Sequence, residues 1–165
     1  MENKDKIKDV TNLLFIKGHT VLLGQKKRGF GKGKFNGFGG KLEPGESIEQ
    51  AAIREAIEES GLTPLVYEKR AIIDFPNSYP FRMNLYVCTK WDGEPQESEE
   101  MRPEWFDFDQ VPYEKMWEDD RYWLKFILEG KKIRASFTFE NNEDLTGTAQ
   151  NKITNHHLEI VDSLD

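Results

Sequence analysis

Apolar residues recur along the chain in the short alternating runs that are typical of β-strands. Two such runs, 10–16 and 21–23, are joined by Lys17-Gly18-His19-Thr20, and this arrangement predicts a β-hairpin. Further strands are predicted at 65–75, 83–90, 104–108, 133–139 and 153–161, with turns bearing proline or glycine at 76–80 and 92–95 and a polar loop at 141–151.

Two segments carry the signals of helices instead. The first helix is predicted over 47–60, because Ser47 and Gln50 have the spacing of a capping box and Gly61 follows as a left-handed stop. A second helix is expected over 118–129. Strands combined with two helices predict an α+β fold, a curved mixed β-sheet flanked by two α-helices.

The length of 165 residues suits one domain, which we expect to span 1–165 with residues 1–7 disordered. The single cysteine, Cys88, cannot form an internal disulfide, which indicates a reducing cytoplasm. No apolar stretch approaches the roughly 18 residues of a membrane span. The first six residues also lack the apolar segment of a secretion signal.

The net charge of −7, from 23 basic and 30 acidic residues, argues against binding to nucleic acid polymers or anionic membranes. The charges are also segregated along the chain. Residues 21–42 contain six basic residues and no acid, residues 43–59 contain six glutamates and Arg54, and residues 92–120 contain twelve carboxylates. A metal-bound polyphosphate needs cations beside carboxylates in this way, although solvated surface charge gives the same pattern. We expect a monomer that acts on a small molecule.

The first predicted helix has a carboxylate face. At 100° per residue, Glu55, Glu58 and Glu59 share one arc of the helix. Like charges at this spacing destabilise a helix unless a cation lies between them, and Mg²⁺ takes such oxygen ligands. A solvated acidic face is the alternative. Another arc is apolar and predicts a core face made of Ala52, Ile53, Ala56 and Ile57.

The segment from Gly40 to Leu62 resembles the Nudix box, Gly-x5-Glu-x7-Arg-Glu-U-x-Glu-Glu-x-Gly-U, in which U is a bulky apolar residue. Every fixed position matches, and the small Ala56 at a U position is the one departure. The resemblance implies a loop–helix–loop that binds Mg²⁺, with Mn²⁺ as a substitute, and hydrolyses a nucleoside diphosphate linked to another moiety. It also implies a structural pair of Arg54 and Glu46, with metal ligands and catalytic groups at Glu55, Glu58 and Glu59, the last of which orders or deprotonates the attacking water.

Three further segments, 26–41, 97–106 and 116–123, resemble the animal Nudix enzymes that act on oxidised purine nucleoside triphosphates. This resemblance implies a pyrophosphohydrolase that converts substrates such as 8-oxo-dGTP into nucleoside monophosphate and pyrophosphate, a sanitation of the nucleotide pool that serves DNA repair. It implies phosphate or sugar contacts for Lys26 and Lys41. It further implies metal ligation by the Gly39 carbonyl and Glu100, and substrate contacts by Thr11, Phe30, Asn36, Phe38, Gly39 and Gly40.

A pocket for the base is predicted at Trp117, Asp119 and Asp120. An indole face can stack on a purine, and two adjacent carboxylates in a partly dry pocket can share one proton, so that the pair donates as well as accepts. The alternative is that both aspartates cap the second helix. The match of the whole segment 117–123 to the same enzymes favours substrate binding. Core positions are expected for Trp105, Trp123, Phe106 and Phe126.

Two other functions stay open at this point. A Nudix hydrolase of ordinary nucleotides or dinucleoside polyphosphates would have the same catalytic helix, whereas a non-catalytic nucleotide-binding module would have no need for all three helix glutamates. The segment 74–83 and residues Asn12 and Phe35 differ from the animal enzymes, Asn12 replacing an aliphatic residue. The choice among oxidised guanine, oxidised adenine, methylated guanine and plain dGTP therefore stays open as well.

Overall fold

The computed structural model describes residues 7–76, 80–140 and 152–165. Its strands form one sheet in the order β3-β2-β1-β5-β4-β7-β8, with β6 paired to β2. The strands are β1 (Lys8–Lys17), β2 (Thr20–Lys26), β3 (Phe35–Asn36), β4 (Thr63–Phe75), β5 (Phe81–Asp92), β6 (Met101–Asp107), β7 (Lys132–Phe139) and β8 (Ile153–Val161). The helices are α1 (Ile48–Ser60) and α2 (Asp120–Leu128), with short 3-10 turns at Phe108–Gln110 and Tyr113–Lys115.

The strand pairing confirms the predicted mixed sheet. β1 runs parallel to β5, β4 runs parallel to β7, and the other pairs are antiparallel. The predicted hairpin is the β1–β2 pair, in which Lys17 lies opposite Thr20. Three predictions fall on residues outside the described ranges. The turn at 76–80 lies outside them in part, the loop at 141–151 lies outside them in full, and so do residues 1–6 of the segment predicted as disordered.

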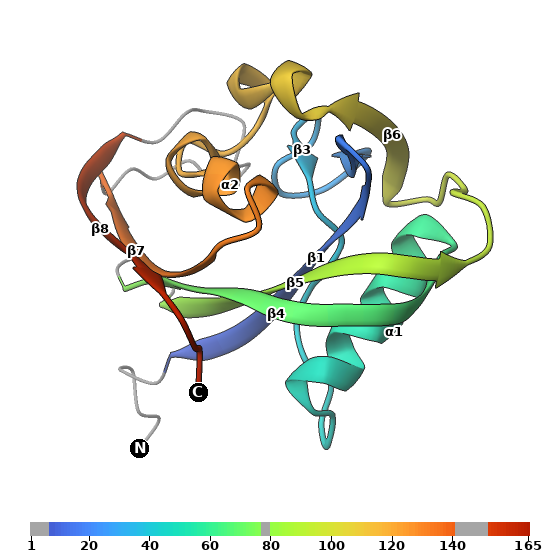
Figure 1. Cartoon of the computed structure of the whole chain (residues 1–165). Helices are drawn as coiled ribbons and strands as arrows, with labels where there is room; N and C mark the ends of the chain where they lie inside the picture. The colour runs from blue at the N-terminus through green and yellow to red at the C-terminus, as the bar shows by residue number, and fades with distance from the viewer. Residues whose placement is uncertain (1–6, 77–79, 141–151) are drawn as a thin grey trace.

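The sheet is buried on both faces, and each face carries one helix (Figure 1). Leu13 and Phe15 of β1 pack in the cluster that contains Ala52 and Ala56 of α1, whereas Leu14 packs in the cluster that contains α2. Because successive side chains of a strand point to opposite faces, α1 and α2 lie on opposite sides of the central strands. The α+β fold predicted from the sequence is thus confirmed. No helix in the described part of the chain is long and apolar enough to cross a membrane.

Helix α1 begins and ends as its sequence predicts. Ser47 accepts a hydrogen bond from the Gln50 N–H at 3.1 Å, and Gln50 Oε1 accepts one from the Ser47 N–H at 2.9 Å. Gly61 closes the helix with a φ of 79°. The predicted core face is wrong at one edge, because Ile57 is 40% exposed while Glu59 is 7% exposed. The last turn of the helix therefore points Glu59, and not Ile57, inward toward residues 26–41, which we call the glycine-rich segment.

Helix α2 is shorter than predicted and starts at Asp120. Trp123 is buried as expected, and Leu124 and Ile127 share its face. Phe106 and Phe126 are partly buried against this core. Trp105 is not a core residue, since it is 36% exposed and stacks on Trp91 at the surface side of β6.

Gly39 lies where two backbone segments come closer than a side chain allows. A Cβ atom at Gly39 would be 1.9 Å from the Thr11 carbonyl oxygen, and one at Gly40 would be 2.8 Å from Glu55 Oε1. Among the glycines of residues 29–40, Gly29, Gly31 and Gly33 have a positive φ. At Gly39 the requirement is space, because the segment passes directly over β1.

We expect the substitution Gly39→Ala to lower the free energy of unfolding by about 3 kcal/mol or more, because the new methyl group meets backbone that cannot move aside. Gly18→Ala is the matched control. Gly18 has a φ of 60° and open space around it, so its loss should be near 1 kcal/mol. Chemical denaturation of both variants measures the difference, and equal losses would contradict the packing argument.

Candidate active site

A cavity of about 420 Å³ is lined by strands of the sheet and by the segment that leads into α2. Its polar groups include Thr11, Asn36, Asp119 and Asp120, which the sequence predicts as substrate contacts. Its walls are largely apolar and comprise Val10, Phe30, Phe75, Phe81, Met83, Met101, Trp117 and Phe139. An enclosure of this size with apolar walls and a few polar groups is typical of a site for a small organic molecule. We call it the apolar cavity.

Much of the apolar wall was missed in the sequence. Phe75, Phe81, Met83, Met101 and Phe139 come from four different strands, and alternation along each strand does not tell which of its two faces is hollow. One signal did point there. The segment 74–83, which departs from the animal Nudix enzymes, supplies three of these side chains.

A second cavity, of about 610 Å³, is polar and shares part of its lining with the first. Its lining consists of Lys26, Arg28, Gly39, Gly40, Glu55, Glu58, Glu59, Ser98, Glu99 and Glu100. The structure therefore brings Glu100, from the loop before β6, into one cavity with Glu55, Glu58 and Glu59 of α1. Lys26, Gly39, Gly40 and Glu59 line both cavities, so they form the junction between them.

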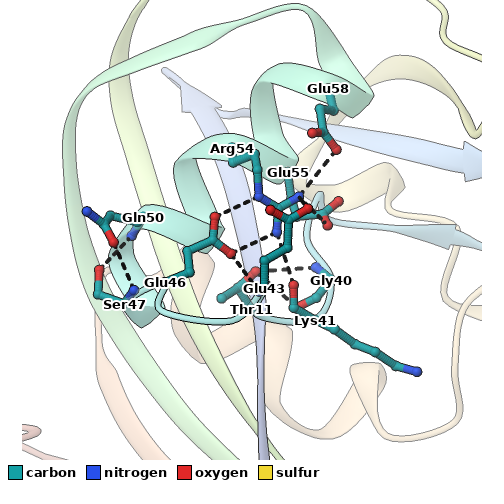
Figure 2. Close-up of polar contacts among 10 residues, drawn as sticks. All are labelled: Thr11, Gly40, Lys41, Glu43, Glu46, Ser47, Gln50, Arg54, Glu55 and Glu58. Carbon is teal, nitrogen blue, oxygen red and sulfur yellow. Dashed lines mark hydrogen bonds and ion pairs between the residues drawn. The ribbon is translucent and has the colours of Figure 1, made fainter.

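Arg54 organises the carboxylates of α1 (Figure 2). Its Nε and Nη2 atoms donate to the two oxygens of Glu46 at 2.7 and 2.9 Å, which is a bidentate pair. Its Nη1 donates to Glu55 at 2.9 Å and to Glu58 at 3.4 Å. The hydrogen bonds from Arg54 lower the pKa of Glu46 to about 2, and those same partners raise the pKa of Arg54. The structural pair of Arg54 and Glu46 is thus present.

Glu59 lies at the junction and is the most buried carboxylate of α1. Its Oε1 accepts a hydrogen bond from the Gly39 N–H at 2.8 Å. Burial raises the pKa of Glu59 to about 7, although the Gly39 N–H opposes this shift and the charge of Glu55 adds to it. A carboxylate with a pKa near neutrality can hold and release a proton at physiological pH, which is the property of a general base.

Glu100 is held by the basic residues of the glycine-rich segment. Arg28 donates to its Oε1 at 2.9 Å, and Lys26 Nζ lies 3.6 Å from its Oε2. The hydrogen bond from Arg28 lowers the pKa of Glu100, so this carboxylate is ionised. The basic run of 21–42 and the acidic run of 92–120, separate in the sequence, therefore meet at one edge of the polar cavity.

The chemistry of the polar cavity fits a divalent cation. Carboxylates are hard oxygen donors, the type that Mg²⁺ and Mn²⁺ bind, and the four that the resemblance implies as ligands line this one cavity together with Glu99. Within the described ranges, however, no three acidic, histidine or cysteine side chains are arranged around a single point as ligands. Each carboxylate is bonded to another partner, Glu55 and Glu58 to Arg54, Glu59 to Gly39 and Glu100 to Arg28.

Asp119 and Asp120 form an acidic pair in the apolar cavity. They are 4% and 7% exposed. Asp119 accepts a hydrogen bond from Trp123 Nε1 at 2.8 Å, and Asp120 accepts one from the Trp117 N–H at 3.0 Å. Asp119 makes no side-chain bond to the start of α2, so capping does not explain its position. Burial raises the pKa of Asp119 to about 6, and burial with the charge of Asp119 raises that of Asp120 well above its usual range.

Trp117 is packed by two residues of the glycine-rich segment. Phe30 stacks on the indole with ring centroids 5.1 Å apart, and Lys34 Nζ lies 5.0 Å from the ring centroid. Lys34 is 8% exposed, and its charge lowers the pKa of Asp120. Sequence reasoning missed Lys34, because in the sequence it is one member of a basic run. A purine stacked on Trp117 stays a prediction.

Two expected substrate contacts do not lie in either cavity. Phe38 is fully buried in the core beside Phe15, with ring centroids 5.9 Å apart, and its side chain lines neither cavity. The Lys41 side chain extends away from Arg54 and the glutamates in Figure 2, while its carbonyl accepts a hydrogen bond from Arg54 at 3.1 Å. Phosphate contact by Lys41 stays a prediction.

Comparison with known proteins bears on this arrangement. The family model described as the NUDIX domain matches residues 6–127, a range that contains helix α1 and the acidic pair. The chain belongs to the Nudix family. The helix of the Nudix box is α1, and Nudix hydrolases generally need a divalent metal, which agrees with the donor chemistry of the polar cavity.

Relatives of this Nudix chain extend over nearly its whole length. It is 42% identical to a zebrafish (Danio rerio) protein named oxidized purine nucleoside triphosphate hydrolase, over 94% of this chain and 96% of that protein. It is 42% identical to a mouse (Mus musculus) protein of the same name, over 93% and 95%. A crystal structure described as a mutator MutT protein from Bacillus halodurans has a TM-score of 0.76 and 26% identity, over 93% of this chain and 98% of that one.

The acidic pair predicts a dependence of stability on pH. Because the pKa of Asp119 is raised from 3.8 to about 6, the folded state binds the proton more tightly than the unfolded state. The stability contributed by that proton is complete below about pH 4 and is lost as the pH rises through about 6. Lys34 favours the charged form of Asp120 and Glu118 disfavours that of Asp119.

We therefore expect the free energy of unfolding of Asp119→Asn, whose amide oxygen can still accept the Trp123 hydrogen bond, to fall by about 2 kcal/mol less than that of the wild type between pH 4.5 and 7.5. Denaturant unfolding at both pH values measures this. Asp107→Asn, at an exposed position, is the matched control and should follow the wild type. A common pH slope in all three proteins would show that the pair does not share a proton.

Proposed function

We propose that this Nudix chain hydrolyses oxidised purine nucleoside triphosphates such as 8-oxo-dGTP to the nucleoside monophosphate and pyrophosphate, with Mg²⁺ as its metal and Mn²⁺ as a substitute. The observation that carries the proposal is the pair of joined cavities. One is apolar and carries an acidic pair, which suits a base, while the other carries carboxylates and cations, which suits a metal-bound polyphosphate. The names of the zebrafish and mouse relatives support the substrate class.

Recognition of an oxidised base is assigned to the acidic pair. If Asp119 and Asp120 hold one proton between them, the pair presents one donor and one acceptor to the edge of a purine. 8-Oxoguanine carries an N–H at position 7, where guanine has an acceptor, so a carboxylate can bind it there. Asn36 adds an amide, which can donate and accept on the same edge.

The hydrolytic step is assigned to the polar cavity. A bound divalent metal would neutralise part of the phosphate charge and would lower the pKa of a water bound to it. Lys26 and Arg28 attract the phosphate oxygens, and Glu55, Glu58, Glu59, Glu100 and the Gly39 carbonyl are the groups that would hold the metal. Glu59 takes a proton from the attacking water as the oxygen of that water bonds to phosphorus. The bond to the bridging oxygen then breaks, and pyrophosphate leaves with the electron pair.

We also infer that the protein acts as a monomer in a reducing cytoplasm, where it sanitises nucleotides and does not bind nucleic acid polymers. The buried, unpaired Cys88 supports the compartment. The net charge of −7 supports the exclusion of polymers.

Glu59→Gln should lower kcat by about a thousandfold or more, since an amide cannot accept the proton from water. The carbonyl of the new amide can still accept the Gly39 N–H, so folding and nucleotide binding should persist. Steady-state release of pyrophosphate and a separate binding titration measure the two effects. Glu49→Gln, at an exposed position of the same helix, is the control. Near-normal turnover in Glu59→Gln would refute the assignment.

A panel of nucleotides tests the substrate class. We expect kcat/KM for 8-oxo-dGTP to exceed that for dGTP at least about tenfold, because one changed hydrogen bond at a buried polar group has at least this effect. The panel also includes 2-hydroxy-dATP, O6-methyl-dGTP and a dinucleoside polyphosphate. A flat profile would indicate a general Nudix hydrolase, and hydrolysis of none of these substrates would indicate a binding module.

A further inference from the structure

Asn12 places an unpaired amide in the wall of the apolar cavity. It lies on β1 next to Thr11, and it lines the same cavity as Asn36 and the acidic pair. Its Oδ1 is buried and has no hydrogen-bond partner among the described residues. Its Nδ2 lies 3.5 Å from the Met83 sulfur, which is a weak acceptor.

This arrangement costs stability in the free protein. A buried carbonyl without a partner loses its bond to water and gains none in return, whereas an aliphatic side chain of the same size would lose nothing. The carbonyl is packed against Gly37, where a Cβ atom would be 2.0 Å from Asn12 Oδ1. The fold therefore leaves room for the amide without supplying a partner for it.

We propose that Asn12 is a base-recognition residue whose amide oxygen accepts a hydrogen bond from the N7–H or the 2-amino group of an oxidised guanine. Rotation of the amide about the Cβ–Cγ bond turns the oxygen from Gly37 toward Met83, which lines the cavity. The same rotation moves Nδ2 to the place beside Gly37 and breaks its weak contact with the Met83 sulfur. An amide at this position then discriminates among purines by the donors they carry, which an aliphatic residue cannot do. This inference rests on the proposed function, because it requires a purine in the apolar cavity.

The test measures binding of reaction products, which needs neither metal nor turnover. Isothermal titration gives the Kd of 8-oxo-dGMP, dGMP and 8-oxo-dIMP for the wild type and for Asn12→Leu. We expect Asn12→Leu to weaken 8-oxo-dGMP about tenfold. The loss of affinity should be smaller for the ligand that lacks the donor. A smaller loss for dGMP, which lacks the N–H at position 7, identifies that N–H as the donor, and a smaller loss for 8-oxo-dIMP identifies the 2-amino group.

Two controls separate this role from a structural one. Val10→Ala changes the same wall on the same strand and should affect all three ligands by the same factor. The melting temperature of Asn12→Leu without ligand should equal or exceed that of the wild type, because the unpaired carbonyl is gone.

The outcomes distinguish this inference from the proposed function. Suppose that the wild type binds 8-oxo-dGMP, and that the Kd values of Asn12→Leu either stay within twofold of the wild-type values or rise by one common factor for all three ligands. Asn12 then does not recognise the base, and only this inference fails. If the wild type binds none of the three, the apolar cavity is not a purine site, and the proposed function fails with it.

Discussion

The hydrogen bond between the Gly39 N–H and Glu59 joins the two halves of the site. It ties the C-terminal end of α1 to the segment that crosses β1, and it lies where the two cavities meet. It requires that Gly39 have no side chain, because the Thr11 carbonyl occupies that space. It also requires that Glu59 be buried, and this burial moves the pKa of the carboxyl toward neutrality. One close approach of backbone to backbone thus sets both the position and the proton affinity of the central carboxylate.

The second constraint is the charge of α1. A helix with carboxylates at positions 55, 58 and 59 is disfavoured by repulsion and by the helix dipole at its C-terminal end. Arg54 offsets this, since its guanidinium bonds Glu46, Glu55 and Glu58 together (Figure 2). Of these three carboxylates, Glu55 and Glu58 line the polar cavity. The matching device on the other side is Arg28, which holds Glu100.

Much of the fold and of the catalytic helix could be predicted from the sequence, because those features are local. Ser47, Gln50 and Gly61 fix the ends of α1 within a few residues, and alternation locates the strands. The burial of Glu59 and the exposure of Ile57 could not be predicted, because helical periodicity does not tell which neighbour covers the last turn. The wall of the apolar cavity could not be predicted for a similar reason, since its residues become neighbours only after four strands have paired. The burial of the Phe38 side chain in the core could not be predicted either, because a family resemblance assigns a position and not the direction of a side chain.

The separation of the two cavities bears on how such a protein changes its substrate. Three of the carboxylates that would take part in hydrolysis, Glu55, Glu58 and Glu59, lie on α1 within the Nudix box. The apolar wall comes largely from strand positions that only need to remain apolar and of suitable size. Four residues belong to both cavities, and two of these are glycines that offer the base no side chain. Substitutions in the wall, such as those of the segment 74–83, can therefore alter which base fits without disturbing the carboxylates. The acidic pair lies within that adaptable half, and its proton affinity is set by the burial that the same wall provides. A change in the wall thus acts on the base in two ways, through shape and through the proton that the pair retains.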